Sequence, residues 1–134
     1  MNALKLKSTE FTPEVLLDPK NNKFEISGES RPEDTGEFYK TILKWLDQYF
    51  SLRYWKDDQV KGNISDMIFE FKFEYFNSTS AKYIMDILLK LEKFLIEKKK
   101  VKVCWYYEHN DIDMLESGER FASMVSVPFD FIEL

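Results

Sequence analysis

The most constraining feature of the sequence is a single change of hydrophobic period between residues 67 and 96. From Met67 to Tyr75 apolar and charged residues alternate, which is typical of a half-buried β-strand. The predicted buried side of this strand consists of Phe69, Phe71, Phe73 and Tyr75. Further along, apolar residues recur at helical spacing, namely Ile84, Ile87, Leu88, Leu91, Phe94 and Leu95. The pattern therefore predicts a strand followed by an amphipathic helix.

Four small polar residues, Asn77 to Ser80, separate the two patterns, and we call this segment the polar turn. Its side chains suit a helix start because they can accept hydrogen bonds from the unpaired backbone N–H groups of the first turn. The same N–H groups and the helix dipole favour an anion. Two interpretations remain open at this point: a capping turn alone, or a turn whose hydroxyl also carries a function.

The other elements alternate along the chain. Two short strands over residues 14–18 and 23–27 enclose a turn and form a β-hairpin. Asp34 and Glu37 have capping-box spacing, and they open a helix whose apolar stripe ends at Tyr49. We predict an irregular connection over residues 51–65 and a strand over residues 101–107. Asp113 and Glu116 form a second capping box, which predicts the start of a short helix. A last strand over residues 129–134 completes the chain.

This order, β-β-α-β-α-β-α-β, predicts an α/β fold in a single domain over residues 1–134. Strands that alternate with helices imply crossover connections, and hence a mixed, mostly parallel sheet that starts with the antiparallel hairpin. The alternating strands indicate that helices cover mainly one face.

Composition excludes several classes of function. A net charge of −5 argues against nonspecific binding to nucleic acid or to an anionic membrane. No apolar run reaches the roughly 18 residues of a membrane-spanning helix, and the amino terminus lacks an apolar core of signal-peptide length. We therefore expect a soluble cytoplasmic protein without membrane insertion. Glycines are scattered singly and Cys104 is the single cysteine, so no cofactor or metal is expected.

One acidic loop offers an alternative, enzymatic interpretation. His109, the single histidine, lies among carboxylates that include Asp111 and Asp113. Such a loop could hold a divalent metal through oxygen ligands or supply acid–base groups. It lacks a second histidine at metal-binding spacing, so a solvated loop that leads into a capped helix is favoured over a small metal-assisted or acid/base enzyme.

The polar turn and the acidic loop each follow the carboxyl end of a predicted strand. In open parallel sheets, functional sites gather outside those ends. If the two strands are neighbours, Ser78 and the carboxylates of Glu108, Asp111 and Asp113 share one rim of the sheet. Such a rim suits a partner-docking surface whose charge phosphorylation changes.

The chain resembles the SiaC-type regulatory phosphoproteins of bacterial biofilm signalling. The resemblance includes the motif Tyr-x-Asn-Ser/Thr-x-Ser-x-Lys, which is matched by Tyr75, Asn77, Ser78, Ser80 and Lys82. Residues 28–34 resemble the family's Gly-Glu-Ser-x-Pro-Glu-Asp stretch, and residues 105–121 resemble its acidic loop and following helix. The similarity extends over nearly the whole chain.

The resemblance implies a fold similar to the STAS domain of anti-anti-sigma factors, and a non-catalytic signalling protein. It implies three partners: a cognate Ser/Thr protein kinase, a PPM-type phosphatase, and a diguanylate cyclase that is bound by the unphosphorylated form. Control of c-di-GMP and biofilm formation would follow. The family's phosphoacceptor is a threonine that aligns with Ser78, with Thr79 and then Ser80 as the alternatives. Tyr75, Asn77 and Lys82 would support the turn.

Overall fold

The computed structural model describes residues 1–59, 66–97 and 100–134. In these ranges the chain forms a sheet of six strands: β1 (Leu4–Leu6), β2 (Glu14–Asp18), β3 (Lys23–Ser30), β4 (Met67–Phe76), β5 (Val101–Tyr107) and β6 (Phe129–Glu133). The helices are α1 (Thr35–Gln59), α2 (Ser78–Ile96) and α3 (Ile112–Met124).

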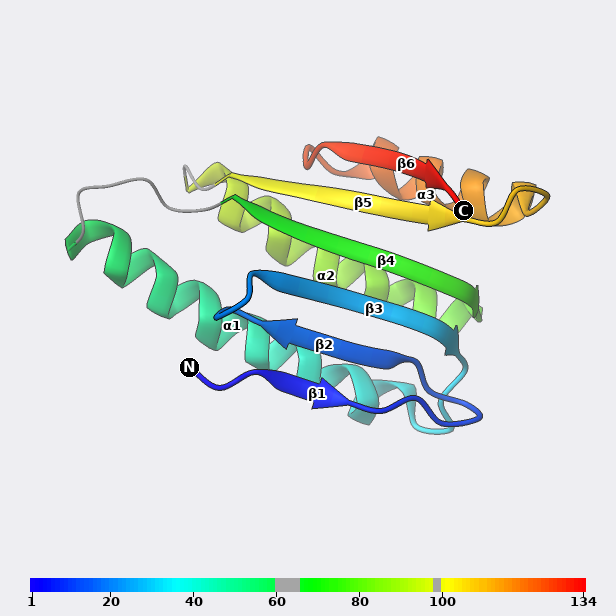
Figure 1. Cartoon of the computed structure of the whole chain (residues 1–134), viewed down its shortest axis with the longest axis horizontal. Helices are drawn as coiled ribbons and strands as arrows, with labels where there is room; N and C mark the ends of the chain where they lie inside the picture. Colours follow the sequence, from blue (N-terminus) through cyan, green and yellow to red (C-terminus); the bar gives the residue numbers. More distant parts are fainter. Residues whose placement is uncertain (60–65, 98–99) are drawn as a thin grey trace.

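The sheet has the strand order β1-β2-β3-β4-β5-β6. The first three strands pair antiparallel, and β3 to β6 pair parallel. Figure 1 shows all three helices behind the sheet, so that one face is covered and the other is open. The prediction of a single-domain, mostly parallel α/β sheet with a hairpin near its start and helices on one face is confirmed.

The core lies between the sheet and the helices. The buried side of β4 and the buried stripe of α2 supply much of it, as the two hydrophobic periods predict. Trp105 of β5 is fully buried, and its indole N–H donates to the Met114 carbonyl at 2.9 Å. A Cβ atom on Gly118 would lie 2.4 Å from the Trp105 ring, so only glycine allows α3 to pack this closely on β5.

Two elements differ from the prediction in extent. β1 was missed because Leu4-Lys5-Leu6 is too short to show a pattern, and it pairs with β2 at the edge of the sheet. The connection predicted from residue 51 onward is wrong up to residue 59, because α1 continues through Gln59. A helix can extend beyond its apolar stripe when no Pro or Gly interrupts it, and Ser51 and Leu52 are exposed. The rest of that predicted connection, residues 60–65, lies outside the described residues.

The predicted orientation of Tyr75 is also wrong. Between Gly28 and Glu29 the β3–β4 register shifts, so that Gly28 pairs with Phe73 but Glu29 pairs with Tyr75. The extra residue on β4, Glu74, makes a β-bulge, and Gly28 has a φ of 101°. Beyond the bulge Phe76 packs against the core, whereas Tyr75 is 50% exposed. Strict alternation cannot anticipate this reversal.

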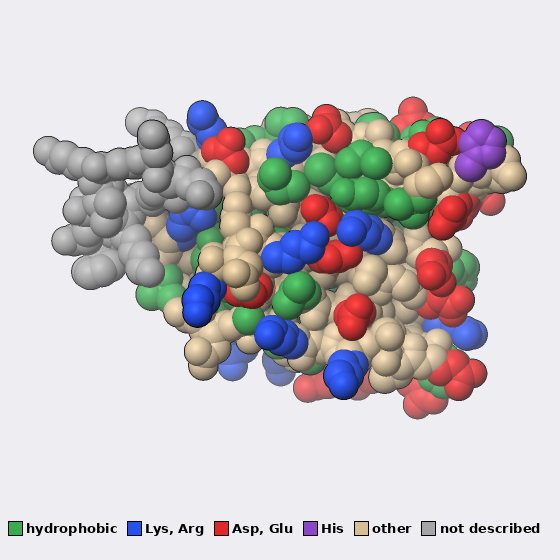
Figure 2. Space-filling view, in the orientation of Figure 1, with side chains coloured by type: hydrophobic (Ala, Val, Ile, Leu, Met, Phe, Trp, Pro, Cys, Tyr) green, Lys and Arg blue, Asp and Glu red, His purple; other side chains and the backbone are tan. Residues whose placement is uncertain are grey.

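The open face of the sheet is polar at its centre, as Figure 2 shows. Lys23 and Lys72 lie between Glu25 and Glu70, with ion-pair distances from 2.9 to 3.6 Å. These charges are therefore paired with one another across β3 and β4. This face of the sheet can remain open to solvent without a helix that covers it.

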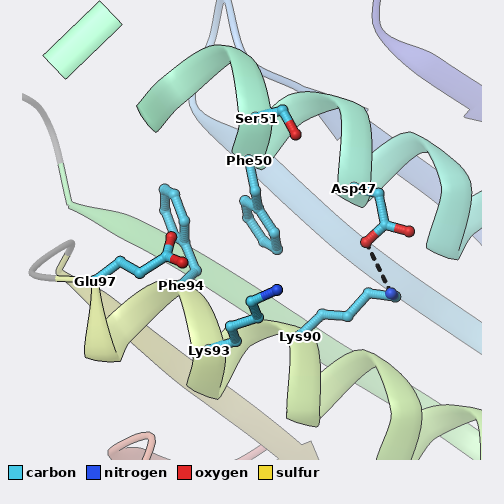
Figure 3. A pocket seen from close by; sticks show the side chains of 7 residues that line it. All are labelled: Asp47, Phe50, Ser51, Lys90, Lys93, Phe94 and Glu97. Carbon is cyan, nitrogen blue, oxygen red and sulfur yellow. Dashed lines mark hydrogen bonds and ion pairs between the residues drawn. The ribbon is translucent and has the colours of Figure 1, made fainter. Parts of the chain in front are cut away.

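A hollow of about 450 Å³ lies between α1 and α2. It is lined by Asp47, Phe50, Ser51, Lys90, Lys93, Phe94 and Glu97, and an ion pair of 2.7 Å joins Lys90 to Asp47 across it (Figure 3). Phe50 and Phe94 stack with ring centres 4.2 Å apart. The hollow lies towards the carboxyl end of α2, away from the polar turn, and contains none of the predicted site residues.

Candidate functional site

The polar turn begins α2, and Asn77 is its N-cap. The Asn77 side-chain oxygen accepts the backbone N–H of Ser80 at 2.9 Å, and the Asn77 backbone is extended, with φ −85° and ψ 173°. This is the geometry that an N-cap requires, because the side chain replaces a missing helical acceptor. The change of period from strand to helix is therefore located correctly by the sequence.

We expect Asn77→Ala to lower the free energy of unfolding by about 1 kcal/mol, because the Ser80 N–H loses its acceptor. Urea denaturation of the two proteins measures the difference. Asn77→Asp is the matched control, since a carboxylate caps equally well. A loss in the alanine variant no larger than that of the aspartate control would show that the side chain does not cap α2.

The three hydroxyls of the turn have different surroundings. Ser78 and Thr79 are exposed, and their side chains face solvent. Ser80 is completely buried: its Oγ donates to the Ser30 carbonyl at 3.1 Å and lies 2.9 Å from the Ser30 Oγ. A kinase acting on Ser80 would have to break these contacts, whereas Ser78 and Thr79 are accessible in the folded protein.

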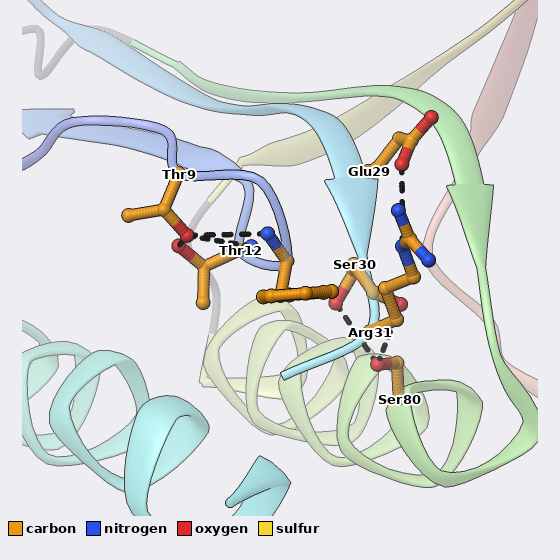
Figure 4. A network of polar contacts seen from close by, with 7 residues as sticks. Thr9, Thr12, Glu29, Ser30, Arg31 and Ser80 are labelled. Atoms are coloured by element: carbon orange, nitrogen blue, oxygen red, sulfur yellow. Dashed lines mark hydrogen bonds and ion pairs between the residues drawn. The ribbon is translucent and has the colours of Figure 1, made fainter. Parts of the chain in front are cut away.

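Ser80 belongs to a buried hydroxyl network that sequence reasoning missed (Figure 4). The Ser30 Oγ also lies 2.6 Å from the Tyr39 hydroxyl, and Tyr39 comes from α1. Burial raises the pKa of Tyr39 above its ordinary value of 10.0, although hydrogen bonds with Ser30 and Ser80 oppose the shift. The sequence contains one sign of this network. Ser30 follows Phe24 and Ile26 at even spacing, so it falls on the same buried side of β3. The network joins β3, α1 and the start of α2 beneath the polar turn.

Lys82 follows Ser78 by one helical turn. Residues four apart on a helix lie on the same face, so Lys82 shares a face with Ser78. Its ammonium group is also the cation nearest to Ser78 in the sequence. The Lys82 Nζ lies 5.3 Å from the centre of the Tyr83 ring, and Tyr83 stacks on Tyr39 at 5.6 Å. Lys82 is exposed and can reorient without disturbing the core.

The polar turn and the acidic loop lie at the same end of the sheet. β4 and β5 are parallel neighbours, so their carboxyl ends, which precede Asn77 and Glu108, meet at one edge (Figure 1). Glu108 and Asp113 are exposed there. The N-cap of α3 is Asp111, whose carboxylate accepts the Met114 N–H at 3.0 Å, so the capping box predicted at Asp113 is wrong by two residues. Asp113 lies in the first turn instead, where an acid suits the helix dipole.

Two of the three residues of the enzymatic alternative are engaged in other contacts. His109 Nδ1 pairs with the Glu133 carboxylate of β6, and Asp111 caps α3. Within the described ranges, no three His, Cys, Asp or Glu side chains are grouped so that they could hold a metal ion.

No helix in the described part of the chain is both long and apolar enough to cross a membrane.

Comparison with known proteins relates this geometry to a family. The family model described as SiaC family regulatory phosphoprotein matches residues 6–134. The chain belongs to the SiaC family. An uncharacterized protein of Pseudomonas aeruginosa (strain UCBPP-PA14) is 26% identical over 129 residues, which cover 96% of this chain and 94% of that protein.

Two solved structures share the SiaC fold. Apo-SiaC from Pseudomonas aeruginosa is 23% identical, with a TM-score of 0.82 over 98% of this chain and 99% of that chain. A chain in the crystal structure of the diguanylate cyclase SiaD in complex with its activator SiaC, from the same species, has a TM-score of 0.83 and 23% identity over the same shares of the two chains. These likenesses establish a common fold.

Proposed function

We propose that this SiaC-family chain is a non-catalytic switch protein, which binds and regulates a diguanylate cyclase while its polar turn is unphosphorylated. The observation that carries the proposal is the exposure of the Ser78 and Thr79 hydroxyls at the start of α2. Membership of a family of regulatory phosphoproteins supports it, and so does the complex that a related SiaC forms with the cyclase SiaD. The proposed consequence is control of c-di-GMP and biofilm formation from the cytoplasm.

We propose Ser78 as the phosphoacceptor, followed by Thr79. Ser78 is the first residue of α2, where unpaired backbone N–H groups and the helix dipole favour an anion. Lys82, one turn further on, offers a positive charge on the same helix face. Ser80 is the weakest candidate because its hydroxyl is buried and hydrogen-bonded to Ser30.

Two enzymes would determine whether the polar turn is phosphorylated. We propose a cognate Ser/Thr protein kinase and a PPM-type phosphatase, as the family resemblance implies. Both need an acceptor that enters an active site without unfolding of the domain. Exposed residues at a helix start meet this need, since the first turn of a helix opens at low cost. Glu108, Asp111 and Asp113 are proposed to border the surface that the partners contact.

Intact-mass analysis of the chain purified from its native host tests the proposal. We expect a species heavier by one phosphate in wild type and in Thr79→Ala, and none in Ser78→Ala. Treatment with a PPM-type phosphatase should remove the added mass. If Ser78→Ala retains the phosphate and Thr79→Ala loses it, the acceptor is Thr79. If neither single variant nor the double variant changes the phosphate content, neither Ser78 nor Thr79 is the acceptor; if Ser80→Ala also retains the phosphate, the polar turn is not the site of modification.

A further inference from the structure

Exposed aromatic and arginine side chains form a continuous surface beside the polar turn. Phe11 is 38% exposed, the Arg31 side chain 44% and Tyr75 50%. The Arg31 guanidinium carbon lies 5.1 Å from the centre of the Phe11 ring, and its Nε lies 3.4 Å from the Glu29 carboxylate. Glu29 in turn pairs with Tyr75 across β3 and β4. We call these four residues, Phe11, Glu29, Arg31 and Tyr75, the Tyr75 surface.

The Tyr75 surface is attached to the polar turn through the backbone. The Arg31 N–H donates to the Phe11 carbonyl at 2.8 Å, which holds the β1–β2 loop against the end of β3. The adjacent Ser30 carbonyl accepts the Asn77 N–H at 3.1 Å. Figure 4 shows Ser30, which directly precedes Arg31, hydrogen-bonded to Ser80 at the start of α2. A partner bound to this surface would therefore lie next to the polar turn.

The exposure of Tyr75 has a specific structural cause. The β-bulge at Glu74 directs Phe76 into the core and leaves Tyr75 outside it. A tyrosine that contributes little to the core but is held on a rigid strand is well suited to binding. Tyr and Arg are the residue types that, with Trp, supply most binding hot spots, because they combine a large contact area with hydrogen-bonding groups.

The charge around the surface indicates the chemistry of the partner. Glu10, Glu33 and Glu74 adjoin it in the sequence and are exposed, and none forms an ion pair with a described residue. Figure 2 shows acidic side chains gathered at this end of the sheet. A partner with acidic groups would be repelled, and one with basic groups at the border of an apolar contact would be favoured.

We propose that the Tyr75 surface is the docking site for the regulated cyclase, which contributes an apolar pocket for Tyr75 bordered by basic side chains. The inference rests on the function proposed above and assigns the contact to residues outside the phosphoacceptor itself. The Arg31 guanidinium lies over the Phe11 ring and pairs with Glu29 through its Nε, and the side chain is 44% exposed, so its terminal N–H groups can reach a partner acceptor.

Calorimetric titration of the unphosphorylated chain with the SiaD-type cyclase of the same organism tests the assignment. We expect Tyr75→Ala and Arg31→Ala each to raise the Kd on the order of tenfold or more. Glu74→Lys should also weaken binding, because it places a positive charge opposite the basic border. Ile96→Ala is the matched control: Ile96 is 71% exposed at the far end of α2, and its variant should bind like wild type. Melting temperatures verify that each variant is folded.

The outcomes separate this inference from the function on which it rests. Suppose that wild type binds the cyclase and that the Kd values of Tyr75→Ala and Arg31→Ala both lie within about twofold of the wild-type Kd. The partner then docks elsewhere, and the proposal is overturned. If the unphosphorylated wild-type chain does not bind the cyclase, the proposed function is wrong, and so is the assignment of the Tyr75 surface as a docking site. An effect of Ile96→Ala as large as that of Tyr75→Ala would also contradict the assignment.

Discussion

Ser78→Glu is expected to bind the cyclase about tenfold or more weakly than wild type, with a melting temperature that is unchanged or slightly higher. The weaker binding arises because the new carboxylate would be desolvated in a contact that otherwise buries a neutral hydroxyl. Basic groups at the border of the partner do not compensate, since an exposed ion pair is worth only about 0–1 kcal/mol. The fold is unaffected, because an acid at a helix start gains roughly 0.3–1 kcal/mol from the dipole and Asn77 still caps α2.

Ser78→Gln is the matched control for Ser78→Glu, because it has nearly the same size and no charge. We expect it to bind more tightly than the glutamate variant, and Ser78→Ala to bind at least as well as wild type and independently of the kinase. If Ser78→Glu melts much earlier than wild type, the switch operates by unfolding rather than at the surface. If it binds as tightly as wild type, Ser78 serves only as the first residue of a helix.

Leu91→Ala is expected to lower the free energy of unfolding by about 2–5 kcal/mol, because Leu91 is completely buried between α2 and the sheet. Leu89→Ala, two residues away on the same helix, is the matched control. Leu89 is 44% exposed, so its loss should change the stability by no more than about 0.5 kcal/mol. Equal losses at the two positions in urea denaturation would mean that the face of α2 that contacts the sheet is assigned wrongly.

The sequence predicts the central part of this fold well because its signals there are local. The alternation in β4, the helical stripe of α2 and the polar residues between them follow from periods of two and 3.6 residues. Asn77 is recognisable as a cap for the same reason, since its partner is only three residues away. The common rim of the polar turn and the acidic loop also followed, because parallel neighbours have their carboxyl ends at one edge.

Most of the features that the sequence did not predict are non-local. The bulge that exposes Tyr75 depends on the register between β3 and β4, which is set by two segments far apart in the chain. The contact between Ser30 and Ser80 joins residues 50 positions apart, and Tyr39 comes from a third element. At α3 both Asp111 and Asp113 are acceptable caps by residue type, and only the backbone decides between them.

The most direct test compares one preparation of the chain in two states. The chain carrying phosphoserine at position 78 is titrated with the SiaD-type cyclase before and after complete removal of the phosphate by a PPM-type phosphatase. Because sequence and preparation are identical, any difference in affinity comes from the phosphate. We expect tight binding after dephosphorylation and binding at least about tenfold weaker before it, with melting temperatures that agree closely. Equal affinities in the two states, or tighter binding by the phosphorylated chain, would contradict it.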